Sequence, residues 1–158
     1  MFNHAPNNYV CPFCVFLHGG DNLENRQQDL VYQDSSVTAF VAPRWWPNNE
    51  GHVLIIPNEH FENLYDLPPL YAHHIQDIAK EIALAFKHIY QCQGVSTRQH
   101  NEPAGNQDVW HYHLHVLPRY VGDDLYYSPR SREVAPPEKR QVYAEGLRRF
   151  FAERNPPD

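Results

Sequence analysis

Residues 111–119 read His-Tyr-His-Leu-His-Val-Leu-Pro-Arg, so histidines alternate with hydrophobic side chains. Successive side chains of an extended strand point to opposite faces, which places His111, His113 and His115 on one face and the hydrophobic side chains on the other. A single histidine on a strand is usually an ordinary surface residue, but three in strict alternation indicate a site. An uncharged imidazole, with an ordinary pKa of about 6.5, can act there as nucleophile, base or metal ligand.

The alternating run resembles the signature of the histidine triad (HIT) superfamily, in which histidines alternate with hydrophobic residues. Upstream, Asn101, Gln107 and Val109 stand where a HIT protein of the hydrolase type has them, and the likeness extends from about Cys11 to Tyr120. The resemblance implies an α+β fold with a mainly antiparallel sheet of about five strands, one long helix and a C-terminal helix.

The length and composition fit one compact domain. We expect residues 1–158 to form a single HIT domain, with a core at about 11–120 and an extension at 121–158 to which the resemblance assigns no role. The net charge of −6 argues against a broad nucleic-acid-binding surface, because duplex nucleic acid is held largely by clustered lysines and arginines. A small phosphorylated ligand remains compatible with that charge, since it needs only a few local donors.

The sequence also predicts where the chain resides. No apolar run approaches the roughly eighteen residues of a membrane span, and residues 1–4 lack the basic start of a secretory signal. Three cysteines, two of them only three positions apart, suit a reduced compartment better than a disulfide framework. We therefore expect a cytoplasmic protein with no membrane association.

Cys11 and Cys14 form a CxxC motif that can present two thiolates to one metal ion. A redox dithiol and an ordinary pair of buried cysteines are the alternatives, although no thioredoxin-like strand and helix surround the motif. Zinc is the favoured interpretation because histidines that could complete the site occur later in the chain.

Three segments before residue 60 read as strands. Residues 29–33 and 37–41 are separated by the turn formers at 34–36 and predict a hairpin. Residues 51–57 are an apolar run of strand length that suits a central position in a sheet. The loop at 42–51 carries Trp45 and Trp46, which can serve equally as a hydrophobic plug or as an aromatic wall for a nucleobase.

A long helix is the most secure element. Apolar residues from Tyr71 to Ile89 recur at spacings of three and four after Pro69, with Asp66 as the expected N-cap and Gly94 as the expected end. The HIT resemblance also implies a short helix at 61–65. After the long helix, a strand at 94–100 and the strand at 111–119 are expected to pair antiparallel, which would hang Asn101 and Gln107 over the histidine face.

The C-terminal part of the chain divides in two. Residues 121–139 are rich in proline, aspartate and serine and are expected to wrap the surface, and a helical pattern returns at about 137–151.

The resemblance implies a covalent mechanism. His113 would attack the α-phosphorus of a nucleoside phosphoramidate or a dinucleoside polyphosphate, giving a nucleotidyl-histidine that water or another acceptor then releases. His115 and His52 would donate hydrogen bonds to phosphate oxygens, and Gln107 and Asn101 would bind phosphate oxygens or the leaving group. The catalytic residues expected are thus His113, His115 and Gln107, and the substrate and the choice between hydrolysis and transfer stay open.

The resemblance to HIT proteins with an N-terminal CxxC implies a structural zinc site formed by Cys11, Cys14, His60 and His111, with His52 as the rival for the third position. Two sulfurs and two nitrogens would close such a site and leave no position for water. The alternative is a catalytic zinc ion held by the triad histidines themselves.

Two departures from the family pattern stand out. The region after the second strand reads Ala42-Pro43-Arg44, so no ribose anchor carries over, and Asn106 replaces a common glycine. Asparagine tolerates a left-handed backbone, which would make the second change harmless. The resemblance further implies a homodimer, and a non-catalytic nucleotide-binding or sensor module remains the alternative to an enzyme.

Overall fold

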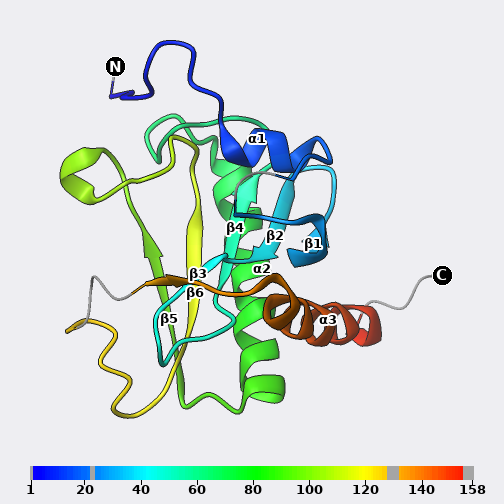
Figure 1. The fold of residues 1–158 in the computed structure, drawn as a ribbon. Coiled ribbons are helices and arrows are strands. Elements are labelled where there is room, and N and C mark those ends of the chain that lie inside the picture. The colour runs from blue at the N-terminus through cyan, green and yellow to red at the C-terminus, as the bar shows by residue number, and fades with distance from the viewer. Residues whose placement is uncertain (1, 22–23, 128–131, 155–158) are drawn as a thin grey trace.

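The computed structural model describes residues 2–21, 24–127 and 132–154. A five-stranded antiparallel sheet forms its centre, in the order β1-β2-β4-β6-β5 (Figure 1). The strands are β1 (Leu30–Gln33), β2 (Val37–Val41), β4 (Val53–Pro57), β5 (Gly94–Gln99) and β6 (Leu114–Arg119). Two-residue strands β3 (Arg44–Trp45) and β7 (Glu133–Val134) form a second, small sheet. The α+β fold class predicted from the sequence is confirmed.

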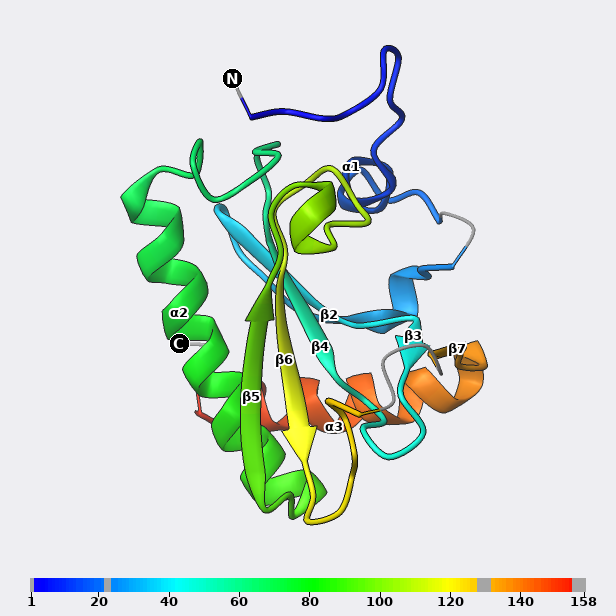
Figure 2. The ribbon, with the colours of Figure 1, turned by 90° about the vertical axis from the view of Figure 1, so that its left-hand side faces the viewer.

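Helices α2 (Pro69–Ala85) and α3 (Pro137–Arg154) cover one face of the large sheet. Ile75, Ile78 and Ile82 of α2, with Leu147 and Phe151 of α3, share a core with the sheet side chains of that face. Figure 2 shows α2 running along the sheet, and the strands that it contacts are β4, β6 and β2. None of the helices in the described part of the chain combines the length and apolar character that crossing a membrane requires.

The opposite face of the sheet carries the chemistry. Leu54 and Ile56 of β4 point there and pack with Phe13 and Phe16 of helix α1 (Pro12–Leu17), a helix that the sequence did not predict. Leu54 pairs with His115 across β4 and β6, so this histidine lies on the α1 side of the sheet, away from α2 and α3.

The strand predicted at 111–119 begins only at Leu114. The reason is that the preceding backbone groups bond outside the sheet: Tyr112 N–H donates to the Phe61 carbonyl at 2.6 Å and His111 N–H to the Val109 carbonyl at 2.9 Å. The pairing of the predicted strand at 94–100 with β6 is antiparallel, as expected.

Several local predictions were wrong. Residues 61–65 form a turn and no helix, because the Asn63 side-chain oxygen caps the N–H groups of Tyr65 and Asp66. The N-cap of α2 is Pro68 in place of Asp66. The helix continues as a π-helix over Phe86–Tyr90 and stops at Gln91, which takes the left-handed conformation at φ 54° three residues before Gly94.

One glycine fixes the entry to β4. Gly51 has a φ of 72°, and a Cβ atom at this position would lie 2.3 Å from the ring of Tyr143 in α3. Only glycine meets both conditions, which ties the chain before β4 closely to the C-terminal helix.

Candidate active site and metal centre

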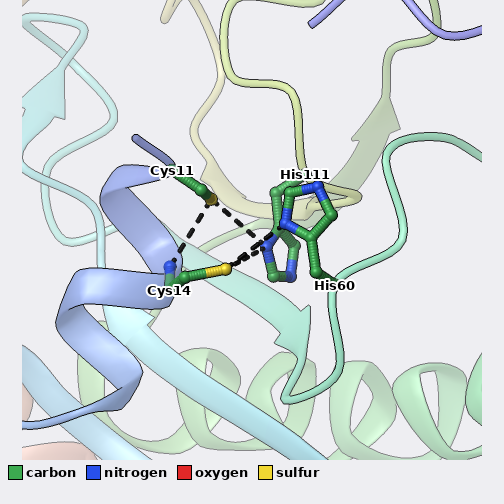
Figure 3. A group of neighbouring side chains, drawn as sticks. All are labelled: Cys11, Cys14, His60 and His111. Atoms are coloured by element: carbon green, nitrogen blue, oxygen red, sulfur yellow. Dashed lines mark hydrogen bonds between the residues drawn. The ribbon is translucent and has the colours of Figure 1, made fainter. Parts of the chain in front are cut away.

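Two cysteines and two histidines gather at the N-terminal end of α1 (Figure 3). Cys11 is the N-cap of α1, and its sulfur accepts a hydrogen bond from the Cys14 N–H at 3.5 Å. His60 follows β4, and His111 precedes β6. The CxxC motif therefore meets histidines from two other segments, and it does so through the helical turn that brings both sulfurs to the same side.

The spacing of these four side chains suits one tetrahedral ion. The Nδ1 atom of His111 lies 3.4 Å from the Cys11 sulfur and 3.7 Å from the Cys14 sulfur, and His60 Nδ1 lies 3.3 Å from the Cys14 sulfur. With metal bonds of about 2.3 Å to sulfur and 2.0 Å to nitrogen, the edges of a tetrahedron measure roughly 3.4 to 3.8 Å. Two thiolates and two imidazoles are also the donors that zinc prefers.

The hydrogen bonding of His111 leaves the correct nitrogen available. Its Nε2–H donates to the Pro57 carbonyl at 3.0 Å, so Nδ1 carries the lone pair that faces the sulfurs. Burial lowers the pKa of His111 to about 4, which keeps the ring uncharged. Burial and the neighbouring Cys11 raise the pKa of the Cys14 thiol to about 12, so ionisation of this pair calls for a cation between the sulfurs.

A backbone hydrogen bond fixes the Nδ1 atom of His113. Its Nδ1–H donates to the His111 carbonyl at 2.8 Å, which leaves the lone pair on Nε2. The ring is 2% exposed, and its centroid lies 5.0 Å from that of His115 and 5.5 Å from that of Phe13. The Nε2 atom lies 3.7 Å from a carboxylate oxygen of Asp108, a residue that the sequence reasoning missed.

His115 and His52 form a buried pair beside His113. Their rings stack with centroids 5.6 Å apart, and His115 Nδ1 lies 3.5 Å from His52 Nε2. Burial, followed by the charges of Arg132 and Arg98, lowers the pKa of His52 to about 3. Burial, followed by the neighbouring His113, holds the pKa of His115 well below its usual range. Both rings are therefore uncharged at neutral pH, and in their contact one nitrogen donates and the other accepts. His52 is not part of the cluster formed by the cysteines.

Two cavities border these histidines. The larger cavity has a volume of about 880 Å³, and His113, His52 and His115 line it. The smaller cavity has a volume of about 410 Å³, and His115 lines it without His113. Asp108 and Arg132 line both cavities.

The structure does not bring Asn101 and Gln107 to either cavity. Asn101 Oδ1 accepts the Leu64 N–H at 2.8 Å. Gln107 is buried, donates to the Glu62 carbonyl at 2.6 Å and accepts the Glu102 N–H at 2.9 Å. These bonds tie the loop before the histidines to the 61–65 turn. Phosphate binding by Asn101 and Gln107 stays a prediction, and their hydrogen bonds give both a positioning role.

Trp45 and Trp46 lie in different environments, one in the core and one at a cavity. Trp45 is a core residue whose Nε1–H donates to the Ala42 carbonyl at 2.7 Å, so it is the plug. Trp46 lines the smaller cavity and packs on Leu117 and Leu125.

The remaining lining residues of the smaller cavity were also missed. Arg98 and His100 could have been found from strand parity, because Arg98 pairs with His115 across β5 and β6. No local pattern could have placed Arg132, which comes from the C-terminal extension. Asn106 does take the left-handed conformation, with a φ of 67°.

Comparisons with known proteins agree with this geometry. The HIT domain family model matches residues 24–122. The Bacillus subtilis protein named Protein hit is 34% identical over 118 residues, which cover 72% of this chain and 74% of that protein. The crystal structure of a Zn-bound histidine triad family protein from Mycobacterium smegmatis matches at a TM-score of 0.74 and 26% identity, over 92% of this chain and 96% of that one.

A diadenosine triphosphate hydrolase from Plasmodium falciparum, solved with cyclomarin A, shares the fold at a TM-score of 0.70 and 16% identity, over 97% of this chain and 90% of that one. The family match spans more than half of the chain, and the bacterial relative exceeds 30% identity over more than two thirds of it. This chain, with its three alternating histidines and its cluster of two cysteines and two histidines, belongs to the HIT family.

Proposed function

We propose that this protein is a nucleotide hydrolase or nucleotidyl transferase that cleaves at the α-phosphate of a nucleoside phosphoramidate or dinucleoside polyphosphate. The hydrogen bond from His113 Nδ1–H to the His111 carbonyl carries the proposal, because in that tautomer the Nε2 lone pair faces a cavity of nucleotide size. The shared fold of a diadenosine triphosphate hydrolase supports the same reaction class.

The reaction runs in two displacements. The Nε2 lone pair forms a bond to the α-phosphorus while the bond to the leaving group breaks, and the leaving group keeps that electron pair. Water or another acceptor then attacks the phosphorus, and the electron pair of the phosphorus–nitrogen bond returns to Nε2. His52 Nε2–H can donate to His115 Nδ1, which leaves the Nε2–H of His115 to stabilise the charge that develops on the nonbridging oxygens.

The metal in the four-residue cluster is proposed to be zinc in a structural role. Cys11, Cys14, His60 and His111 supply four donors, which closes the coordination shell, and a Zn-bound relative of the same fold supports the assignment. When bound, the ion would clamp α1 to the segment that carries His113. Of the described His, Cys, Asp and Glu side chains, no other group of three or more gathers this closely.

We further propose a cytoplasmic homodimer. The three thiols are unpaired, which suits a reducing compartment. β5 ends the strand order of the large sheet, and an outer strand can pair with the same strand of a second copy. Light scattering coupled to size-exclusion chromatography measures this assembly directly.

The test of the reaction is His113→Ala against a panel of adenosine and guanosine phosphoramidates and dinucleoside polyphosphates. We expect loss of nucleotide release and of the nucleotidyl adduct seen by intact-mass spectrometry, with metal content and the circular dichroism spectrum unchanged. His73→Ala, at an exposed position of α2, is the matched control. Retained turnover in His113→Ala would reject the nucleophile. Nucleotide binding without turnover or adduct in the parent protein would favour the sensor module.

A further inference from the structure

The two cavities beside the histidines differ in their chemistry. Apolar side chains form much of the larger cavity, including Phe13, Val15, Leu54 and Val109. Its acidic and basic side chains balance one another in number: Asp21, Glu24 and Asp108 against Arg26, Arg44 and Arg132. An apolar lining with balanced charge suits a nucleoside.

Among the described residues, the lining of the smaller cavity is basic and includes no aliphatic side chain. Arg98 and Arg132 face one carboxylate of the described lining, that of Asp108. Asp108 is bound to Arg132, whose guanidinium nitrogen lies 3.3 Å from Oδ2. The smaller cavity therefore carries an excess of positive charge.

Arg98 is the second guanidinium in the described lining of the smaller cavity. Its guanidinium carbon lies 5.4 Å from the centroid of the Trp46 ring and 4.7 Å from that of Tyr126. In the described part of the chain, no carboxylate lies within ion-pair distance of it. Rings on which a guanidinium packs hold it in place while its N–H donors remain available to an anion.

The fold places this cation next to the reaction centre. Arg98 pairs with His115 across β5 and β6, and His100 continues the same face. His115 lines both cavities, whereas His113 lines only the larger one. The smaller cavity therefore adjoins, at His115, the cavity in which His113 would attack phosphorus, and it can receive the leaving group.

We propose that the smaller cavity binds the phosphate chain of the leaving group, so that the preferred substrate is a nucleotide anhydride and not a phosphoramidate with an amine leaving group. This inference rests on the proposed function. As the His113 Nε2–phosphorus bond forms, the bond from the α-phosphorus to the bridging oxygen breaks. The oxygen keeps the electron pair and departs as a terminal phosphate, whose added negative charge Arg98 and Arg132 offset.

The test compares two substrates in one variant. Arg98→Gln removes the charge and keeps part of the stem. We expect it to lower kcat/KM for diadenosine triphosphate about tenfold or more and to leave kcat/KM for an adenosine phosphoramidate of an uncharged aromatic amine within about twofold. Arg149→Gln, an equal loss of charge at an exposed position of α3, should change neither value. An equal loss for both substrates, or no loss for either, overturns the proposal.

A binding measurement separates this inference from the catalytic one. With AMP present, calorimetry should show that inorganic triphosphate binds the parent protein and Arg149→Gln, and at least about tenfold more weakly to Arg98→Gln. If that binding pattern holds while no substrate is turned over, the proposed reaction fails and the anion site stands. If turnover depends on His113 but triphosphate binds Arg98→Gln as tightly as the parent protein, the anion site alone fails.

Discussion

The Nε2 atom of His113 lies 3.7 Å from Oδ1 of Asp108, whose other oxygen binds Arg132. With an ordinary pKa of about 3.9 and the Arg132 guanidinium beside it, the Asp108 carboxyl is charged at neutral pH. In the proposed reaction this carboxylate lies beside the nitrogen that attacks phosphorus, so its charge would oppose the oxygens of a bound phosphate.

We therefore expect Asp108→Asn to strengthen AMP binding. The carboxylate is half exposed, so the effect is modest, about two- to fivefold in Kd at low ionic strength, and it shrinks in about 0.5 M salt. Calorimetric titration with AMP at two salt concentrations measures it, with the exposed Asp77→Asn of α2 as the control. Weaker binding in Asp108→Asn would show instead that the carboxylate contacts the ligand, as a ribose hydroxyl partner would.

The second prediction concerns the metal cluster. Cys14→Ser should lose the bound metal and lower the Tm by roughly 10 °C, because the free energy of metal binding at a structural site stabilises the folded protein. Turnover should fall as well, since the backbone of the ligand His111 also accepts the hydrogen bond from His113. Elemental analysis, a thermal melt and the substrate panel on one preparation give all three values.

Cys92→Ala is the matched control for that experiment, because Cys92 is a buried thiol outside the cluster. It should keep a full complement of metal. Full metal content in Cys14→Ser would show that this thiol is not a ligand.

The third prediction tests the pair that anchors α3. Arg140 and Asp29 are buried, with Arg140 Nε 3.0 Å from Asp29 Oδ1. Arg140 also donates to the Glu24 carbonyl at 2.8 Å. Arg140→Met should destabilise the protein by about 3–5 kcal/mol, because it leaves a buried carboxylate without its cation.

A double-mutant cycle isolates the pair. Adding Asp29→Asn to Arg140→Met should recover about 1.5–3 kcal/mol, measured as the free energy of unfolding in urea. Additive losses in the double variant would mean that the two side chains do not stabilise each other.

The sequence predicted those elements whose pattern is local. The hairpin that became β1 and β2, the apolar strand β4 and the apolar face of α2 each follow from side-chain period within one segment. The metal cluster was also predicted residue by residue, through the family resemblance. By contrast, α1 spans only Pro12–Leu17, too short for its periodicity to be visible.

The smaller cavity could not be predicted for a different reason. Arg132 reaches Asp108 from a segment whose composition indicates only surface chain, and the contact spans 24 positions in the sequence. The start of β6 was misplaced because the backbone of His111 and Tyr112 bonds to residues outside the sheet, which side-chain alternation cannot reveal. Tertiary contacts thus decide the part of the site that the extension contributes.

The last prediction follows from the buried His52. Burial lowers the pKa of His52 to about 3, below the ordinary value near 6.5. Between these two values the unfolded chain binds a proton at His52 and the folded chain does not. The contribution of His52 to the free energy of unfolding is therefore fully present above about pH 6.5. It is lost as the pH falls, at roughly 1.4 kcal/mol per pH unit.

His52→Gln should remove this contribution to the pH dependence of stability between about pH 6 and pH 4. Urea unfolding at a series of pH values measures it as the difference from the parent, while His73→Gln, exposed on α2, should keep the parent slope. Equal slopes in parent and His52→Gln would show that His52 takes up its proton in the folded protein, and the uncharged donor assigned to this ring would then be lost at mildly acidic pH.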